Sequence, residues 1–259
     1  MILKKAGDLN TKPFRIISLV PSQTELLHYL GLQDETIGIT KFCIHPAEWF
    51  STKIRIGGTK KLNIEKIISL NPDLIIANKE ENLKREIEAL AKNFNIWVTE
   101  INNFEDALTM IGDVGTLTAK EQKAAILIAG IKKQFTLFKK NLPPKKTAYL
   151  IWKDPYMTVG GDTFISNMLQ LAGFKNVFGE RLRYPQITID ELQQSACELL
   201  FLSSEPYPFS QKHLDELKTH LPAVKIVLVD GEMFSWYGSR LLKVPEYFNK
   251  LTSTINATK

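Results

Sequence analysis

The sequence has very few cysteines and no long apolar segment. Only two of its 259 residues are cysteine, Cys43 and Cys197, which are too few for a disulfide framework. No segment approaches the ~20 consecutive apolar residues of a membrane-spanning helix, so we expect no membrane span. Residues 1–15 lack the apolar core and cleavage site of a signal peptide and a lipobox-like cysteine. As written, the chain is expected in the cytoplasm, whereas a native chain trimmed ahead of Met1 would be periplasmic or extracytoplasmic.

Motifs of catalysis and of nucleic-acid binding are also missing. The sequence has no Walker-type lysine loop for ATP hydrolysis and no Gly-x-Ser-x-Gly nucleophile turn. Its net charge of +5 comes from scattered lysines and arginines, which is typical of a solvated surface with a modest preference for anionic ligands. We therefore expect a protein that is not an enzyme, requires no cofactor and binds no nucleic acid.

A repeat is the most informative feature that the sequence does contain. Residues 63–77 and 188–202 share one pattern: a helix-capping residue, Ile, an acid, an amphipathic helix, a second acid and a short apolar strand. A second match relates residues 26–31 to residues 168–173, where two apolar residues precede a glycine. Because the two matches occur in the same order, they indicate a duplication. Two similar lobes follow, and the natural place for a ligand is the cleft between them.

Strand and helix patterns alternate along both halves, which predicts α/β lobes, each a parallel sheet flanked by helices. Ser22-Gln23-Thr24-Glu25 has the spacing of a capping box that opens the first helix. Residues 41–62 follow no regular pattern and are predicted to form a long functional loop. Asn63 and Thr188 are expected to cap the two repeat helices, with Glu191 completing a capping box at the second.

One long helix is predicted between the halves. The capping-box pattern Thr118-Ala119-Lys120-Glu121 precedes about 20 residues with apolar side chains at helical spacing. Such a helix would be roughly 35 Å long. The expected domains are an N-terminal lobe, a bridging helix and a C-terminal lobe, at residues 1–117, 118–143 and 144–259.

Over roughly residues 14–255 the chain resembles a family of transport proteins. Its segments are a strand, a Pro-Ser-Gln-Thr-Glu helix, a Gly-Gly loop, an Asn-Ile-Glu helix, an Asn-Pro-Asp-Leu-Ile-Ile strand, a long helix and a second lobe. This order resembles the cobalamin- and iron-chelate-binding proteins of ABC importers, most of all the cobalamin-binding branch. The resemblance implies two lobes joined by one long α-helix, with a corrinoid, haem-like or iron-chelate ligand between them. It also implies the membrane subunits of an ABC importer as partners.

The resemblance further implies which residues bind the ligand. Flat side chains suit a flat macrocycle or chelate, and the family lines its cleft with such groups. The corresponding positions here are Phe42, Trp152, Tyr156, Met157 and Tyr184. In the Gly-Gly loop, where the family carries a tryptophan, this chain has Thr59 and Lys60, a departure that counts against cobalamin itself.

A loop after the last predicted strand adds three candidates without the resemblance. Trp236 and Tyr237 make this loop too aromatic for an ordinary surface loop. Arg240 could hold a carboxylate or phosphate of the ligand with its forked guanidinium.

Two acids are the expected transporter-docking residues. Glu65 and Asp190 coincide when the two repeats are overlaid. The family presents one carboxylate per lobe, near the start of this helix, to arginines on its membrane partner. An acid in the first turn also complements the helix dipole, so a purely structural role stays open.

Cys43 and His45 leave two alternatives open. A thiolate and an imidazole two residues apart could hold a transition metal with a third ligand. The lack of a signal-peptide pattern favours a second hypothesis, a cytosolic metal or cofactor binder on the same scaffold without a transporter, for which Cys43 and His45 are the residues to test. The third hypothesis is an enzyme with Cys43 as nucleophile and His45 or His28 as base, for which two residues along one chain is a poor geometry.

Overall fold

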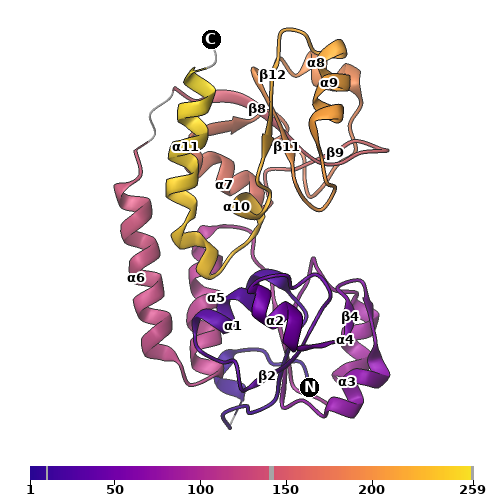
Figure 1. The fold of residues 1–259 in the computed structure, drawn as a ribbon, viewed down its shortest axis with the longest axis vertical. Coiled ribbons are helices and arrows are strands. Elements are labelled where there is room, and N and C mark those ends of the chain that lie inside the picture. The colour runs from indigo at the N-terminus through magenta and orange to yellow at the C-terminus, as the bar shows by residue number, and fades with distance from the viewer. Residues whose placement is uncertain (10, 140–142, 258–259) are drawn as a thin grey trace. The chain divides into compact units, whose positions relative to one another are not determined.

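A computed structural model describes residues 1–9, 11–139 and 143–257, and its strands form two mainly parallel sheets with helices around each (Figure 1). The predicted α/β fold class is confirmed. The elements of the first half are, in chain order, η1 (Ala6–Asp8), β1 (Ile16–Ser18), α1 (Pro21–Tyr29), β2 (Thr36–Ile39), α2 (Ala47–Thr52), β3 (Ile54–Arg55), β4 (Gly57–Gly58), β5 (Lys61–Leu62), α3 (Ile64–Leu70), β6 (Leu74–Asn78), α4 (Lys84–Leu90), β7 (Ile96–Thr99) and α5 (Phe104–Leu117).

The later elements begin with a helix that follows α5 directly. They are α6 (Glu121–Leu137), β8 (Lys145–Trp152), β9 (Met157–Thr158), α7 (Phe164–Ala172), β10 (Phe174–Asn176), α8 (Ile189–Gln194), β11 (Leu199–Ser203), α9 (Gln211–His220), β12 (Lys225–Val229), α10 (Glu232–Ser235), η2 (Ser239–Leu242) and α11 (Val244–Ala257). No helix in the described part of the chain is both long enough and apolar enough to span a bilayer.

The two sheets have the same strand connectivity. The first has the order β3-β2-β1-β6-β7, and all of its neighbouring strands are parallel. The second has the parallel order β10-β8-β11-β12, with β9 antiparallel on the end of β8. Strands β2, β1, β6 and β7 therefore correspond to β10, β8, β11 and β12. The two copies of the sequence repeat occupy equivalent positions in the two halves of the fold. The first copy covers α3 and β6, and the second covers α8 and β11.

Helix caps explain why the repeat segments fold alike. The Asn63 side chain accepts a hydrogen bond from the Lys66 N–H at 3.0 Å, and α3 ends at Asn71, which is left-handed with φ 42°. At α8 the Thr188 hydroxyl accepts from the Glu191 N–H at 3.2 Å, and the Glu191 carboxylate accepts from the Thr188 N–H at 2.8 Å. Both predicted caps are confirmed, and each satisfies N–H groups that a helix start leaves without intrahelical partners.

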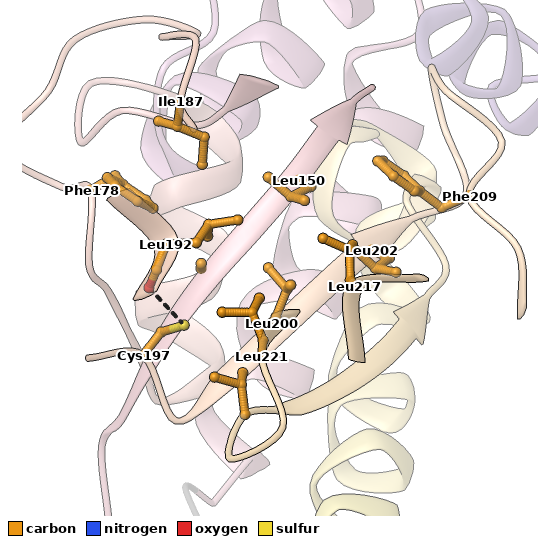
Figure 2. Close-up of a cluster of buried hydrophobic side chains, with 12 residues drawn as sticks. Leu150, Phe178, Ile187, Leu192, Cys197, Leu200, Leu202, Phe209, Leu217 and Leu221 are labelled. Carbon is orange, nitrogen blue, oxygen red and sulfur yellow. Dashed lines mark hydrogen bonds between the residues drawn. The ribbon is translucent and has the colours of Figure 1, made fainter. Parts of the chain in front are cut away.

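Successive residues of a strand point to opposite faces of its sheet. In the second sheet β8 and β11 have runs of consecutive buried residues, so both faces of the sheet are covered there. On one face Leu150, Leu200 and Leu202 pack with side chains of α8 and α9 (Figure 2). On the other face the Tyr149 and Phe201 rings contact the Phe234 ring of α10, with centroids 5.4 and 6.1 Å away. This two-sided core fixes the strand ends that carry the candidate site.

Two sequence predictions about the first half are wrong. The segment 41–62 is not an irregular loop, because it contains α2 and the short strands β3, β4 and β5. Ser22-Gln23-Thr24-Glu25 is not a capping box, because α1 already begins at Pro21 with Val20 as its N-cap residue. Proline fits the first helical position since its missing N–H would have no partner there.

The predicted long helix is shorter than expected and has no Thr118 cap. The Thr118 hydroxyl donates to the Val114 carbonyl at 2.7 Å and so belongs to the end of α5. The next helix, α6, runs from Glu121 to Leu137, about 25 Å at the usual rise per residue. Residues 140–142 of the predicted helix lie outside the described residues.

Among the described residues the chain forms two compact units. Unit 1 takes in residues 1–101, 105–133 and 237–242, and unit 2 takes in residues 102–104, 134–236 and 243–259. The boundary between the units cuts α6 between Lys133 and Gln134. The predicted domain boundaries at 117 and 143 stay a prediction.

Candidate functional site

In unit 1 Phe42 follows the carboxyl end of a parallel strand, where open α/β sheets bind ligands, whereas Thr59 and Lys60 form the turn of the antiparallel pair β4–β5. Phe42 comes three residues after β2, and its side chain is 50% exposed, although it is a large apolar group. Its ring lies close to the backbone of Gly58, where an added Cβ would come within 3.1 Å of the Phe42 Cε2. The Lys41 ammonium lies 5.1 Å from the centroid of the same ring. Thr59, next to Gly58, is buried.

A second loop of unit 1 is held against the Thr59–Lys60 turn. The Asn82 amide donates to the Thr59 carbonyl at 3.1 Å, and the Lys60 ammonium donates to the Glu80 carbonyl. Burial raises the pKa of the Glu81 carboxyl, an effect that the nearby Lys60 charge opposes. The β4–β5 turn therefore carries the Lys60 charge close to Glu81.

Cys43 follows Phe42 in the chain but does not share its exposure. Its side chain is fully buried, and its sulfur lies 3.1 Å from the Thr24 hydroxyl and 3.2 Å from the Thr40 hydroxyl. Burial raises the pKa of the Cys43 thiol, so the neutral thiol is the favoured form. Across residues 1–9, 11–139 and 143–257 no three His, Cys, Asp or Glu side chains are placed to hold a metal ion. The structure does not bring a third ligand to Cys43 and His45.

In unit 2 an aromatic surface follows β8 and β11. Trp152, the last residue of β8, is 40% exposed, and its ring lies 5.6 Å from the Tyr207 ring at 68°. Tyr156 and Tyr207 are both half-buried and pack on the hydrophobic cluster that contains Leu150 and Phe209. An edge-on arrangement of this kind is a favourable geometry for two aromatic rings. The core therefore supports a cluster of aromatic side chains at these strand ends.

Met157 and Tyr184 are joined to the same surface by backbone pairing. Met157 forms an antiparallel bridge with Gln186, and the Thr158 N–H donates to the Pro185 carbonyl at 3.0 Å. The loop that follows residue 179 also packs closely on Gly161, where a Cβ would lie 2.1 Å from the Gly179 carbonyl oxygen. Only glycine fits there. Tyr184 is thus held by backbone contacts beside Met157.

The remaining ligand candidates are buried and already have partners. The Trp236 indole N–H donates to Glu205 Oε1 at 2.9 Å, and the side chain is 6% exposed. Tyr237 is 7% exposed. The Arg240 guanidinium donates from Nε and Nη2 to the two carboxylate oxygens of Glu25, at 2.9 and 3.0 Å. Trp236 belongs to unit 2, whereas Tyr237 and Arg240 belong to unit 1.

The two predicted docking acids lie at equivalent positions. Glu65 is in the first turn of α3 and Asp190 in the first turn of α8, and both side chains are exposed. Since α3 and α8 correspond in the two sheets, each unit presents one carboxylate at the same place in its fold.

The sequence marks the segment of Tyr207 and Glu205 as a strand-end loop, but it does not assign roles to Tyr207, Glu205 or Glu25. Tyr207 stands in the segment Ser203–Phe209, whose mix of aromatic and polar residues after an apolar strand is a recognisable pattern. The roles of Glu205 and Glu25 depend on partners 31 and 215 residues away, which no local pattern shows.

Comparisons with known proteins identify a family and several similar proteins. A family model described as periplasmic binding protein matches residues 16–226. The vitamin B12-binding protein of Vibrio vulnificus (strain CMCP6) is 29% identical over 200 residues, which cover 73% of this chain and 71% of that protein. An uncharacterized ABC transporter substrate-binding lipoprotein of Bacillus subtilis (strain 168), YvrC, is 29% identical over 192 residues, 70% of this chain and 60% of that protein.

Solved structures show the same fold at lower identity. The crystal structure of the periplasmic vitamin B12 binding protein BtuF of Vibrio cholerae has a TM-score of 0.79 at 23% identity, covering 95% of this chain and 99% of that one. The periplasmic heme-binding protein RhuT from Roseiflexus sp. RS-1 has a TM-score of 0.80 at 18% identity, covering 94% and 98%.

Proposed function

This chain belongs to the periplasmic binding protein family, and from that premise we propose that it binds a corrinoid, haem-like or iron-chelate ligand for an ABC importer. The proteins that it resembles are binding proteins for transport and not enzymes, which agrees with the prediction that this chain is not an enzyme. The ligand is cargo for transport rather than a cofactor.

One observation supports the proposal most strongly. Large apolar side chains stand exposed at the carboxyl ends of parallel strands in both units, with Phe42 at 50% and Trp152 at 40% exposure. Exposed aromatic side chains that also pack against the core are typical of ligand-binding surfaces, because they add contact area at a low cost in side-chain entropy. We propose that unit 1 contributes Phe42, Thr59 and Lys60 and that unit 2 contributes Trp152, Tyr156, Met157 and Tyr184.

Alanine substitution of the exposed aromatics tests this assignment. We expect Trp152→Ala and Phe42→Ala each to weaken ligand binding by about tenfold or more, since an aromatic side chain that becomes buried against a ligand can carry about 2 kcal/mol of binding energy. The measurement is a calorimetric titration with whichever of cobalamin, haem and a ferric chelate the unmodified protein binds. Phe14→Ala is the matched control, because Phe14 is 67% exposed but precedes β1 at the opposite end of the strand. Equal affinity in both site variants and the unmodified protein would overturn the assignment.

We propose further that Glu65 and Asp190 dock onto the importer. Their exposure and equivalent placement support one carboxylate contact per unit. Glu65→Ala combined with Asp190→Ala should leave ligand affinity unchanged and abolish co-purification with the importer's membrane subunits. The control replaces two exposed acids elsewhere, Glu88 and Asp215, by alanine. Co-purification of the Glu65/Asp190 variant at the level of the unmodified protein would contradict the docking role.

A further inference from the structure

Tyr207 lies between a candidate ligand-binding side chain and a buried histidine of unit 2. Its ring is 5.6 Å from the Trp152 ring on one side and 5.4 Å from the His213 ring on the other. The Tyr207 hydroxyl is 3.2 Å from Nε2 of His213. His213 is 6% exposed and also packs edge-on against Phe209, with centroids 5.6 Å apart. The position of Tyr207 beside Trp152 is therefore linked to His213.

The backbone fixes which nitrogen of His213 carries the proton. The Ser210 N–H, at the start of α9, donates to Nδ1 of His213 at 3.0 Å. A backbone N–H cannot act as an acceptor, so Nδ1 must be unprotonated in this arrangement. The neutral ring then carries its proton on Nε2, which donates to the Tyr207 oxygen. A second proton on Nδ1 would face the Ser210 N–H, so this hydrogen bond of the helix cap would be lost and the ring would have to turn toward the Ser210 hydroxyl, 3.1 Å from Nδ1. Nε2–H would still donate to Tyr207, so Tyr207 would move with the ring.

Some of the charges around His213 lower its pKa and others raise it. Lys212 and Lys153 disfavour the imidazolium, whereas Glu216 of α9 and Asp154, which follows β8, favour it. The Lys153 ammonium is paired with the Glu216 carboxylate, which balances these two groups against each other. Tyr207 itself faces Nε2 with its hydroxyl. Burial has the largest effect and lowers the pKa of His213 below its ordinary value, so the ring is neutral near neutral pH.

We propose that neutral His213 is a positioning residue that holds Tyr207 against Trp152, and that its protonation in acid turns the ring away from the Ser210 N–H, moves Tyr207 with it and weakens ligand binding. The proposal rests on the proposed function of Trp152 as a ligand contact. His213 does not touch the ligand; it acts through Tyr207. The protein would thus bind its ligand more tightly at neutral than at acidic pH.

Ligand titrations at about pH 7.5 and about pH 5 test the proposal with three variants. In the unmodified protein we expect affinity to fall roughly three- to tenfold in acid, the range of one or two hydrogen bonds. His213→Gln keeps an amide that can donate to Tyr207 but does not titrate, so the fall should disappear. Tyr207→Phe should bind at both pH values with the acid affinity of the unmodified protein. The matched control is His220→Gln, at the exposed end of α9, which should retain the fall.

Ligand-free measurements separate this proposal from the proposed function. We expect long-range proton–nitrogen NMR spectra to show His213 as the Nε2–H tautomer near neutral pH, assigned by its loss in His213→Gln. The indole N–H resonance of Trp152, assigned by Trp152→Phe, should shift as His213 titrates and should not shift in His213→Gln. If none of the three ligand classes binds, the proposed function is wrong. The spectra would still test whether His213 positions Tyr207 beside Trp152. An Nδ1–H tautomer, or equal pH dependence in the unmodified protein and His213→Gln, would overturn the proposal.

Discussion

At the scale of single residues, Arg240 shows how a partner far along the chain changes an assignment. Its sequence neighbours predict a ligand contact, whereas the structure pairs it in a forked geometry with Glu25, 215 residues earlier. The two side chains are only 7% and 15% exposed, so neither charge is well solvated. The pair joins η2 to α1 within unit 1.

We predict that Arg240→Ala lowers the free energy of unfolding by about 3 kcal/mol, because it leaves the Glu25 carboxylate buried without its partner. Combining it with Glu25→Leu should cost less than the sum of the single changes, since no buried charge then remains. Urea denaturation measures both effects. A variant of unchanged stability but weakened ligand affinity would show instead that Arg240 contacts the ligand.

Cys43 shows the same limit of local patterns. The spacing to His45 predicts a metal pair, but Thr24 and Thr40 bring hydroxyl groups to the sulfur from α1 and from the end of β2. Thr24 lies 19 residues before Cys43, so no local pattern reveals that contact. The burial of Cys43 likewise could not be read from the chain, because residues 41–62 form a folded segment rather than an open loop.

At the scale of elements, the repeat helices were predictable because their signals are local. A cap and its N–H partner lie three residues apart, so Asn63 and Thr188 could be identified from the sequence. The capping-box pattern gives a wrong prediction where its side chains bond to other groups instead of to the N–H groups of a helix start. Thr24 and Glu25 have capping-box spacing, but Thr24 bonds to the Val20 carbonyl and Glu25 pairs with Arg240.

We predict that Asn63→Ala and Thr188→Ala each lower the free energy of unfolding by about 1 kcal/mol, the usual loss when a helix cap is removed. Ser253→Ala is the control, because this exposed hydroxyl bonds within α11 to the Asn249 carbonyl and caps nothing. It should change stability by less than about 0.5 kcal/mol. Equal losses at all three positions, measured by urea denaturation, would mean that the caps add nothing specific.

At the scale of the whole molecule, the duplication is the feature that the sequence predicts best. Both copies use short apolar strands with helices before and after them, and such periodic segments determine a parallel sheet with little help from distant residues. The strand orders β2-β1-β6-β7 and β10-β8-β11-β12 correspond position by position, as two halves of common origin require. The candidate site was less predictable, since Trp152, Tyr207 and His213 come from three separate segments and meet only in the folded unit.

The central claim is that this protein binds a flat metal chelate for import. Its most direct test is a tryptophan-fluorescence titration of the purified protein with cobalamin, haem and a ferric chelate, each corrected for absorption by the ligand alone. The exposed Trp152 makes fluorescence a suitable probe. We predict saturable quenching by one of the three at low micromolar concentration or below, and its loss in Trp152→Ala. Folded protein that responds to none of them would contradict the claim and favour the alternative of a metal or cofactor binder without a transporter.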